Sequence, residues 1–219
     1  MATILGIDEA GRGPIIGPMV MAGVMMEEKD VEKLVRLGVK DSKLLNPAKR
    51  EELFDEIKRL AKDFRIMIVG VEEIDRAVMS ETDMNLNVLE IKKAAHIVRR
   101  LCPDKVIMDA PSRNTAAVTE QLQSFVKKDG IHIICKNKAD VDYPIVGAAS
   151  ILAKVMRDRE IQKIKRKYGI DCGSGYLSDP FTNSFFREHF DKFPIFRKSW
   201  APYRSLVAQK GQSSLKKFW

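Results

Sequence analysis

The stretch Ile4-Leu5-Gly6-Ile7-Asp8-Glu9-Ala10-Gly11-Arg12-Gly13-Pro14 carries an apolar run into two acidic residues and then into a glycine-rich turn. The apolar residues from 3 to 9 predict a buried β-strand, and the glycines and proline that follow predict its end. A strand that delivers carboxylates into such a turn is suited to holding a hard cation, because Mg²⁺ and Mn²⁺ prefer carboxylate and water oxygens. We therefore interpret this segment as part of a metal site.

Four more apolar runs predict four more strands, at 18–26, 64–72, 105–109 and 131–136. The first two strands of the chain are joined by a short link with Pro14 and Gly17-Pro18, which predicts a β-hairpin. Helical periods near 114–128 and 144–167 alternate with the later strands, as is typical of parallel β-α-β units. The expected fold class is α/β, with a mixed five-stranded sheet flanked by helices.

Two earlier helices are also expected. Asn46 is a suitable N-cap residue and Pro47 suits the first helical position, so a helix is predicted to begin there. The second helix is expected from Thr82 to about Leu101, where apolar residues recur with a helical period. The composition after Gly173-Ser174-Gly175 shifts toward Phe, Trp and Pro, which favours a small helical element packed on the main sheet.

The bulk properties indicate a globular protein. The 219 residues are 45% hydrophobic and 31% charged, and no apolar run approaches the roughly 20 residues of a membrane span. Three well-separated cysteines favour neither a disulfide framework nor a zinc site. From these features we expect a cytoplasmic monomer with no membrane partner. The net charge of +8 is compatible with a polyanionic partner, although a charge of this size also serves solubility.

Two further aspartates follow predicted strands, Asp109 at the end of one run and Asp140 a few residues past the next. Ligands gather at the carboxyl ends of strands in α/β sheets, so we expect both near Asp8. Glu9 presents a difficulty, because successive strand residues face opposite sides. Either the strand breaks at Glu9, or Glu9 contributes partly through its backbone carbonyl.

The opening segment resembles the first motif of type 2 ribonucleases H, the ribonuclease HII family. The resemblance continues in order to about residue 204, and the overall length and style look archaeal. The matching motifs are Asp41-Ser42-Lys43, Met108-Asp109-Ala110, Lys138-Ala139-Asp140, Ala148-Ala149-Ser150-Ile151-Leu152-Ala153-Lys154, Gly173-Ser174-Gly175-Tyr176 and Ser178-Asp179-Pro180. One departure is Gly147, where the family more often has serine.

The resemblance implies a ribonuclease H-like fold and a metal-dependent endonuclease. The composition shift after Gly175 and the polar segment near the end of the chain further predict a catalytic domain at 1–170, a helical C-terminal element at 171–208 and a flexible tail at 209–219. Four acidic residues correspond to the family's catalytic metal ligands: Asp8, Glu9, Asp109 and Asp140. Two divalent ions, Mg²⁺ or Mn²⁺, would act together on the scissile phosphate, with Asp8 as the expected bridging ligand.

By the same resemblance, the enzyme cleaves the RNA strand of RNA/DNA hybrids and cuts on the 5′ side of single ribonucleotides embedded in duplex DNA. It would leave 3′-hydroxyl and 5′-phosphate ends. The residues expected to contact the substrate are Gly11, Arg12, Gly13, Lys43, Ser150, Lys154 and Tyr176. The turn and the tyrosine would sense the 2′-hydroxyl, the group that distinguishes RNA from DNA, while Ser150 and Lys154 share a helix face and would grip a phosphate.

The C-terminal residues Gln212-Ser213-Ser214-Leu215-Lys216-Lys217-Phe218-Trp219 resemble the short peptide that replication proteins insert into a sliding clamp. One helical turn would bring Leu215, Phe218 and Trp219 together as an apolar plug beside Gln212. The alternative is a tail that folds back onto its own domain.

Two other functions stay open. A DNA nuclease or integrase-like protein of the same fold would also cluster carboxylates, and selectivity for a 2′-hydroxyl would separate it from a ribonuclease. A non-catalytic nucleic-acid or clamp-binding adaptor is the second alternative, and the intact acidic set argues against it.

Overall fold

The structure is a computed structural model that describes residues 1–39 and 45–215, with side chains to residue 210. The chain forms two compact units. The sheet unit comprises Met1–Ala10, Val20–Ile68 and Leu86–Arg157, and the second unit comprises Gly11–Met19, Val69–Asn85 and Asp158–Trp219. The expected division of the chain at 170 and 208 stays a prediction. Lys43, Phe218 and Trp219 lie outside the described residues.

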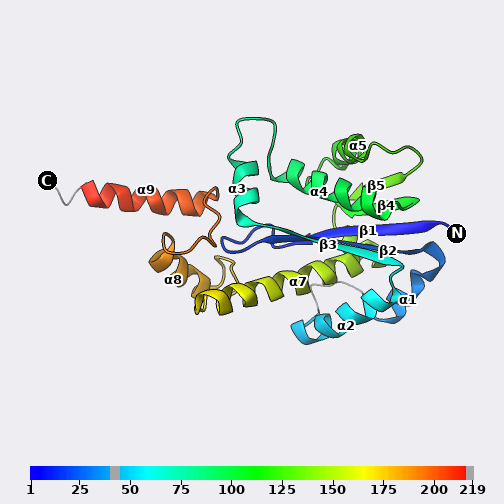
Figure 1. The fold of residues 1–219 in the computed structure, drawn as a ribbon, viewed down its shortest axis with the longest axis horizontal. Coiled ribbons are helices and arrows are strands. Elements are labelled where there is room, and N and C mark those ends of the chain that lie inside the picture. Colours follow the sequence, from blue (N-terminus) through cyan, green and yellow to red (C-terminus); the bar gives the residue numbers. More distant parts are fainter. Residues whose placement is uncertain (40–44, 216–219) are drawn as a thin grey trace. The chain divides into compact units, whose positions relative to one another are not determined.

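A five-stranded mixed sheet forms the centre of the sheet unit, with strand order β3-β2-β1-β4-β5 (Figure 1). The strands are β1 (Thr3–Ala10), β2 (Met19–Glu27), β3 (Asp63–Val69), β4 (Lys105–Asp109) and β5 (His132–Lys136). β1 pairs antiparallel with β2, parallel with β4, and β4 pairs parallel with β5. The hairpin, the parallel strands and the fold class are therefore confirmed.

The helices among the described residues are, in chain order, a 3-10 turn (Glu28–Asp30), α1 (Glu32–Arg36), α2 (Pro47–Leu60), α3 (Val71–Val78), α4 (Leu86–Leu101), α5 (Thr115–Val126), α6 (Ala139–Asp142), α7 (Pro144–Tyr168), α8 (Pro180–His189) and α9 (Ala201–Leu215). The predicted start of α2 is confirmed, since the Asn46 side chain accepts a hydrogen bond of 2.8 Å from the Lys49 N–H.

Two predicted boundaries were wrong. The run 64–72 is a strand only to Val69, and α3, which the sequence reading missed, begins at Val71. The helix expected from Thr82 begins at Leu86. Helix α9 runs through residue 209 and ends at Leu215, and the flexibility expected from residue 209 onward stays a prediction. No helix in the described part of the chain is long and apolar enough to cross a membrane.

Both faces of the central strands are buried, each against its own helices (Figure 1). Ile4, Val24 and Ile107 face α2 and α7, whereas Leu5 and Met108 face α4 and α5. Because side chains alternate along a strand, this pattern assigns every residue of β1 and β4 to one face or the other. We call the first face the α7 face and the second the α4 face.

Close approach of a helix to a strand sets the geometry of the α7 face. A Cβ atom on Gly6 would lie only 2.3 Å from the backbone oxygen of Ile145, at the start of α7. Only glycine allows the first turn of α7 to lie directly on β1. This contact places the residues that follow in α7 above the end of β1, where Asp8 lies.

Candidate functional site

Asp8 and Asp109 lie side by side on the α7 face of the sheet. The parallel register pairs Ile7 with Met108, so the next residues along the two strands are Asp8 and Asp109. Both follow residues of that face in alternation, Asp8 following Gly6 and Asp109 following Ile107. The sheet therefore brings together two carboxylates that are 101 positions apart in the sequence.

Asp140 reaches the same place from the segment after β5. It lies in the short helix α6, whose first residue, Ala139, donates its N–H to Asp109 Oδ1 at 2.9 Å. This bond ties α6 to the end of β4. Asp140 is 4% exposed and Asp8 is 5% exposed, so both carboxylates are removed from bulk water.

The environment of Asp8 raises its pKa from 3.8 to about 7. Burial is the largest cause, and the negative charges of Asp109 and Asp140 raise the pKa further. Hydrogen bonds from the Ser150 hydroxyl and the Glu9 N–H, the latter 2.8 Å long, act in the opposite direction. The charges of Asp109 and Asp140 thus act on the Asp8 carboxylate, and a cation bound beside these carboxylates would relieve the repulsion.

A cation would find an all-oxygen donor set here, which is what Mg²⁺ and Mn²⁺ prefer. Among the described residues, however, no three acidic, histidine or cysteine side chains already enclose one point as a finished metal cage. Mg²⁺ is commonly held by one or two carboxylates and completes its shell with water and substrate phosphate oxygens. The open arrangement of Asp8, Asp109 and Asp140 fits that kind of ion.

Glu9 is placed differently from the other three. β1 stays paired through this position, with Glu9 opposite Met21 and Ala10 opposite Val20, so the strand break that would turn its side chain toward Asp8 does not occur. By alternation the Glu9 side chain lies on the α4 face. The other alternative, that Glu9 binds the metal partly through its backbone carbonyl, stays a prediction.

Helix α7 supplies the polar side chains beside the aspartates. Ser150 is fully buried and its hydroxyl bonds to Asp8, which indicates that it orients that carboxylate. Lys154 lies one turn further on and is half-buried. The sequence reading missed Arg157, which is 5% exposed and shares this helix face by its spacing of seven from Ser150. That spacing was the signal that could have found it.

Gly147 has a structural consequence in α7. A Cβ atom there would lie 3.1 Å from the Asp140 backbone oxygen and 3.4 Å from a methyl group of Val39. The missing side chain lets α7 pack closely against the segment that carries Asp140.

The predicted substrate-contacting turn and tyrosine both belong to the second unit. Gly11 has a φ of 77°, a conformation that glycine adopts without strain. Tyr176 is 38% exposed. The Gly175 carbonyl, just before Tyr176, accepts hydrogen bonds from the N–H groups of Ile15 at 2.9 Å and Ile16 at 3.3 Å. The structure therefore connects the segment after the turn to the loop that carries the tyrosine.

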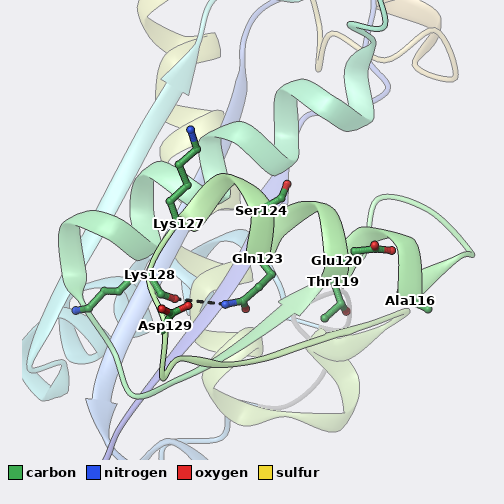
Figure 2. Close-up of a pocket in the computed structure, with 8 residues that line it drawn as sticks. All are labelled: Ala116, Thr119, Glu120, Gln123, Ser124, Lys127, Lys128 and Asp129. Atoms are coloured by element: carbon green, nitrogen blue, oxygen red, sulfur yellow. Dashed lines mark hydrogen bonds between the residues drawn. The ribbon is translucent and has the colours of Figure 1, made fainter.

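A pocket of about 680 Å³ lies on α5, but none of the predicted site residues lines it (Figure 2). Its lining mixes Glu120 and Asp129 with Lys127 and Lys128, and the Gln123 side chain donates to the Lys128 carbonyl at 3.3 Å. Charges of both signs balance in this pocket, so we assign the chemistry to the aspartates and not to the pocket.

Comparison with known proteins gives a consistent result. The sequence model of the family described as Ribonuclease HII matches residues 5–202. A relative from Pyrococcus furiosus, described as Ribonuclease HII, is 45% identical over 97% of this chain and 96% of its own. The crystal structure of the ribonuclease H2 from Pyrococcus horikoshii OT3 is similar with a TM-score of 0.83 and 38% identity, covering 94% of this chain and 98% of that one.

A second solved structure contains a partner protein. It is the PCNA:RNase HII complex from Archaeoglobus fulgidus, similar with a TM-score of 0.82 and 38% identity, covering 90% of this chain and 95% of that one.

Proposed function

The chain belongs to the ribonuclease HII family and is a metal-dependent ribonuclease H, and from this premise we propose that it cleaves the RNA strand of RNA/DNA hybrids and cuts 5′ to single ribonucleotides in duplex DNA. The observation that carries the proposal is the convergence of Asp109 and Asp140 on the buried Asp8. Clustered, desolvated carboxylates are costly for a fold, which argues for a function that needs them.

The residues that would hold divalent cations are Asp8, Asp109 and Asp140, with Glu9 contributing through its backbone carbonyl. Two such ions, when bound, would supply an activated water and charge stabilisation for the departing oxygen. Asp8, between β2 and β4 at the centre of the sheet, is the expected shared ligand. Ser150 holds the Asp8 carboxylate through its hydroxyl and thereby sets its direction.

Discrimination of RNA from DNA is assigned to the second unit. Gly11-Arg12-Gly13 would present its backbone to the 2′-hydroxyl, and the exposed Tyr176 would contact the neighbouring sugar. A Cβ atom on Gly13 would meet no described heavy atom within 4 Å, so packing within the protein does not require glycine there. Close approach of a ligand would require it. Lys154, Ser150 and Lys43 are the candidates for phosphate contacts, which position a nucleic acid without reading its sequence.

The C-terminal peptide is proposed to bind a sliding clamp. The similar protein from Archaeoglobus fulgidus was solved in complex with PCNA. Gln212 and Leu215 lie in the last described turn of α9, and a further helical turn would place Leu215, Phe218 and Trp219 on one side.

The proposal is tested by cleavage of a labelled DNA duplex with one ribonucleotide, beside an all-DNA duplex, in Mg²⁺, Mn²⁺ or EDTA. We expect a metal-dependent cut only on the 5′ side of the ribonucleotide. Equal cutting of the all-DNA duplex would indicate a DNA nuclease instead. Binding without any cutting would indicate an adaptor.

A further inference from the structure

Arg197 is fully buried in the second unit, and its guanidinium contacts the backbone of the glycine-rich turn. Nη2 donates to the Gly11 carbonyl at 2.5 Å, Nη1 donates to the Arg12 carbonyl at 2.7 Å, and Nε donates to the Gly17 carbonyl at 3.0 Å. These three carbonyls use the planar fork of donors that only arginine offers. The contact joins residues about 185 positions apart in the sequence.

Holding the carbonyls also orients the N–H groups of the turn. In a planar trans peptide the carbonyl of one residue and the N–H of the next point in opposite directions. Bonds from Arg197 to the carbonyls of Gly11 and Arg12 therefore turn the N–H groups of Arg12 and Gly13 away from the guanidinium. The open side of Gly13, described above, is the space that a ligand would use.

Trp200 completes this support. Its indole N–H donates to the Gly13 carbonyl at 3.2 Å, and its ring lies 4.9 Å from the guanidinium carbon of Arg197. The cation–π contact holds the two side chains together. All three carbonyls of the Gly-Arg-Gly turn are thus hydrogen-bonded by one pair of side chains.

The segment that carries Arg197 and Trp200 is itself held in place. Asp75 of α3 accepts hydrogen bonds of 2.9 Å from the N–H groups of Lys198 and Ser199, and a third of 2.5 Å from the Ser199 hydroxyl. The Arg197 N–H donates to the Ile15 carbonyl at 2.9 Å. A support that is itself rigid can set the geometry of the turn before any ligand arrives.

The loop that carries Tyr176 is also held by hydrogen bonds, on one side to Thr182 and on the other to the segment after the turn. The Thr182 hydroxyl accepts the Gly175 N–H at 2.9 Å and donates to the Cys172 carbonyl at 2.8 Å. Gly175 in turn binds Ile15 and Ile16 through its carbonyl. The turn and Tyr176 are therefore built into one hydrogen-bonded frame.

We propose that Arg197 and Trp200 are positioning residues that set the selectivity of the protein for a ribonucleotide over a deoxyribonucleotide. They act through the Gly11–Gly13 turn and do not themselves touch the substrate. This inference rests on the proposed function, in which that turn senses the 2′-hydroxyl.

The test is the affinity for two matched duplexes, one with a single ribonucleotide and one of DNA alone. Binding is measured in the Asp8→Asn background, so that the substrate is not cut. Trp200→Phe keeps an aromatic ring over Arg197 but removes the N–H, and Arg197→Lys keeps the charge but removes the fork. Tyr203→Phe is the matched control, because Tyr203 packs in the same apolar cluster and has no part in holding the turn.

We expect Trp200→Phe to weaken binding of the ribonucleotide duplex roughly three- to tenfold, the loss of about one hydrogen bond, and Arg197→Lys to weaken it more. Affinity for the all-DNA duplex stays unchanged, because the proposed phosphate contacts of Lys154, Ser150 and Lys43 lie outside the turn. Tyr203→Phe retains the parent selectivity.

A purely structural role would lower both affinities together, and that result would overturn the inference, as would unchanged selectivity in Trp200→Phe. Failure of the proposed function looks different, since the parent protein itself would then not distinguish the two duplexes. Thermal unfolding of each variant identifies any that do not fold. If Arg197→Lys does not fold, the result for Trp200→Phe decides the test.

Discussion

Replacing Asp8 with asparagine is expected to stabilise the metal-free protein while abolishing its activity. Asparagine has nearly the same shape as aspartate but carries no charge. It therefore removes the repulsion from Asp109 and Asp140 and the cost of burying a third carboxylate in the same place. The destabilisation caused by the carboxylate cluster should be measurable as a lower free energy of unfolding of the parent protein.

The magnitude follows from the pKa of Asp8, which burial and its acidic neighbours raise from 3.8 to about 7. Because the folded pKa lies above the unfolded one, the stability that Asp8 contributes is fully present below pH 3.8 and is lost as the pH rises to about 7. The loss would be about 4 kcal/mol at 1.36 kcal/mol for each pH unit. Relaxation of the site reduces it, so we expect about 2–4 kcal/mol, or roughly 4–16 °C in Tm for a protein of this size.

The assay is thermal unfolding at pH 5 and pH 8 in EDTA, for the parent, Asp8→Asn and the exposed-site control Asp142→Asn. Asp8→Asn should unfold at a higher temperature than the parent at pH 8, with a smaller difference at pH 5. The control should follow the parent at both values. Added Mg²⁺ should stabilise the parent by mass action and the variant less. Equal stability of Asp8→Asn and the parent at pH 8 would show that burial and the neighbouring carboxylates do not destabilise Asp8.

Four further predictions concern backbone positions and the C-terminus. Gly13→Ala should unfold like the parent, because its Cβ meets open space among the described residues, yet lose selective cleavage of a single ribonucleotide in a gel assay; intact cleavage would remove Gly13 from the substrate site. Gly11→Ala should lose about 1–2 kcal/mol in urea unfolding because of its positive φ, and an unchanged midpoint would contradict the turn geometry. Gly6→Ala should lower the free energy of unfolding by about 1–3 kcal/mol or more in urea unfolding, since its Cβ would lie 2.3 Å from the Ile145 oxygen. Gly13→Ala is the control, and equal stabilities of the two variants would argue against the close packing of α7 on β1. Deleting residues from Gln212 onward should abolish binding to a sliding clamp in calorimetry while hybrid cleavage without the clamp is kept, and retained clamp binding would place the contact elsewhere.

Much of the sheet unit could be predicted from local patterns. The apolar runs identified β1, β2, β4 and β5, and strand ends identified Asp8 and Asp109, because carboxyl ends of parallel strands meet at one edge. Helix α3 was missed, because the apolar run from 64 was extended past Gly70, the residue that separates the strand from the helix. The strand ends at Val69, and Gly70 is the N-cap residue of the helix that begins at Val71.

Glu9 shows where a local pattern leaves a choice that packing decides. Because side chains alternate along a strand, Asp8 and Glu9 face opposite sides unless the strand breaks between them. Nothing in the sequence determines whether β1 continues past Asp8. The paired register through Ala10 decides it, because the hydrogen bonds to β2 keep the strand extended. The side chain of Glu9 is thereby assigned to the α4 face.

Local sequence patterns were sufficient to predict the fold class, the acidic strand ends and the glycine-rich turn, because periodicity, strand ends and turn residues are properties of neighbouring residues. Tertiary structure alone decided how that turn is held. Nothing in the local sequence connects Arg197 and Trp200 to Gly11–Gly13, about 185 positions away. A buried arginine needs hydrogen-bond acceptors, and the carbonyls of a tight turn need donors. Only the folded chain shows that Arg197 donates to the carbonyls of this turn.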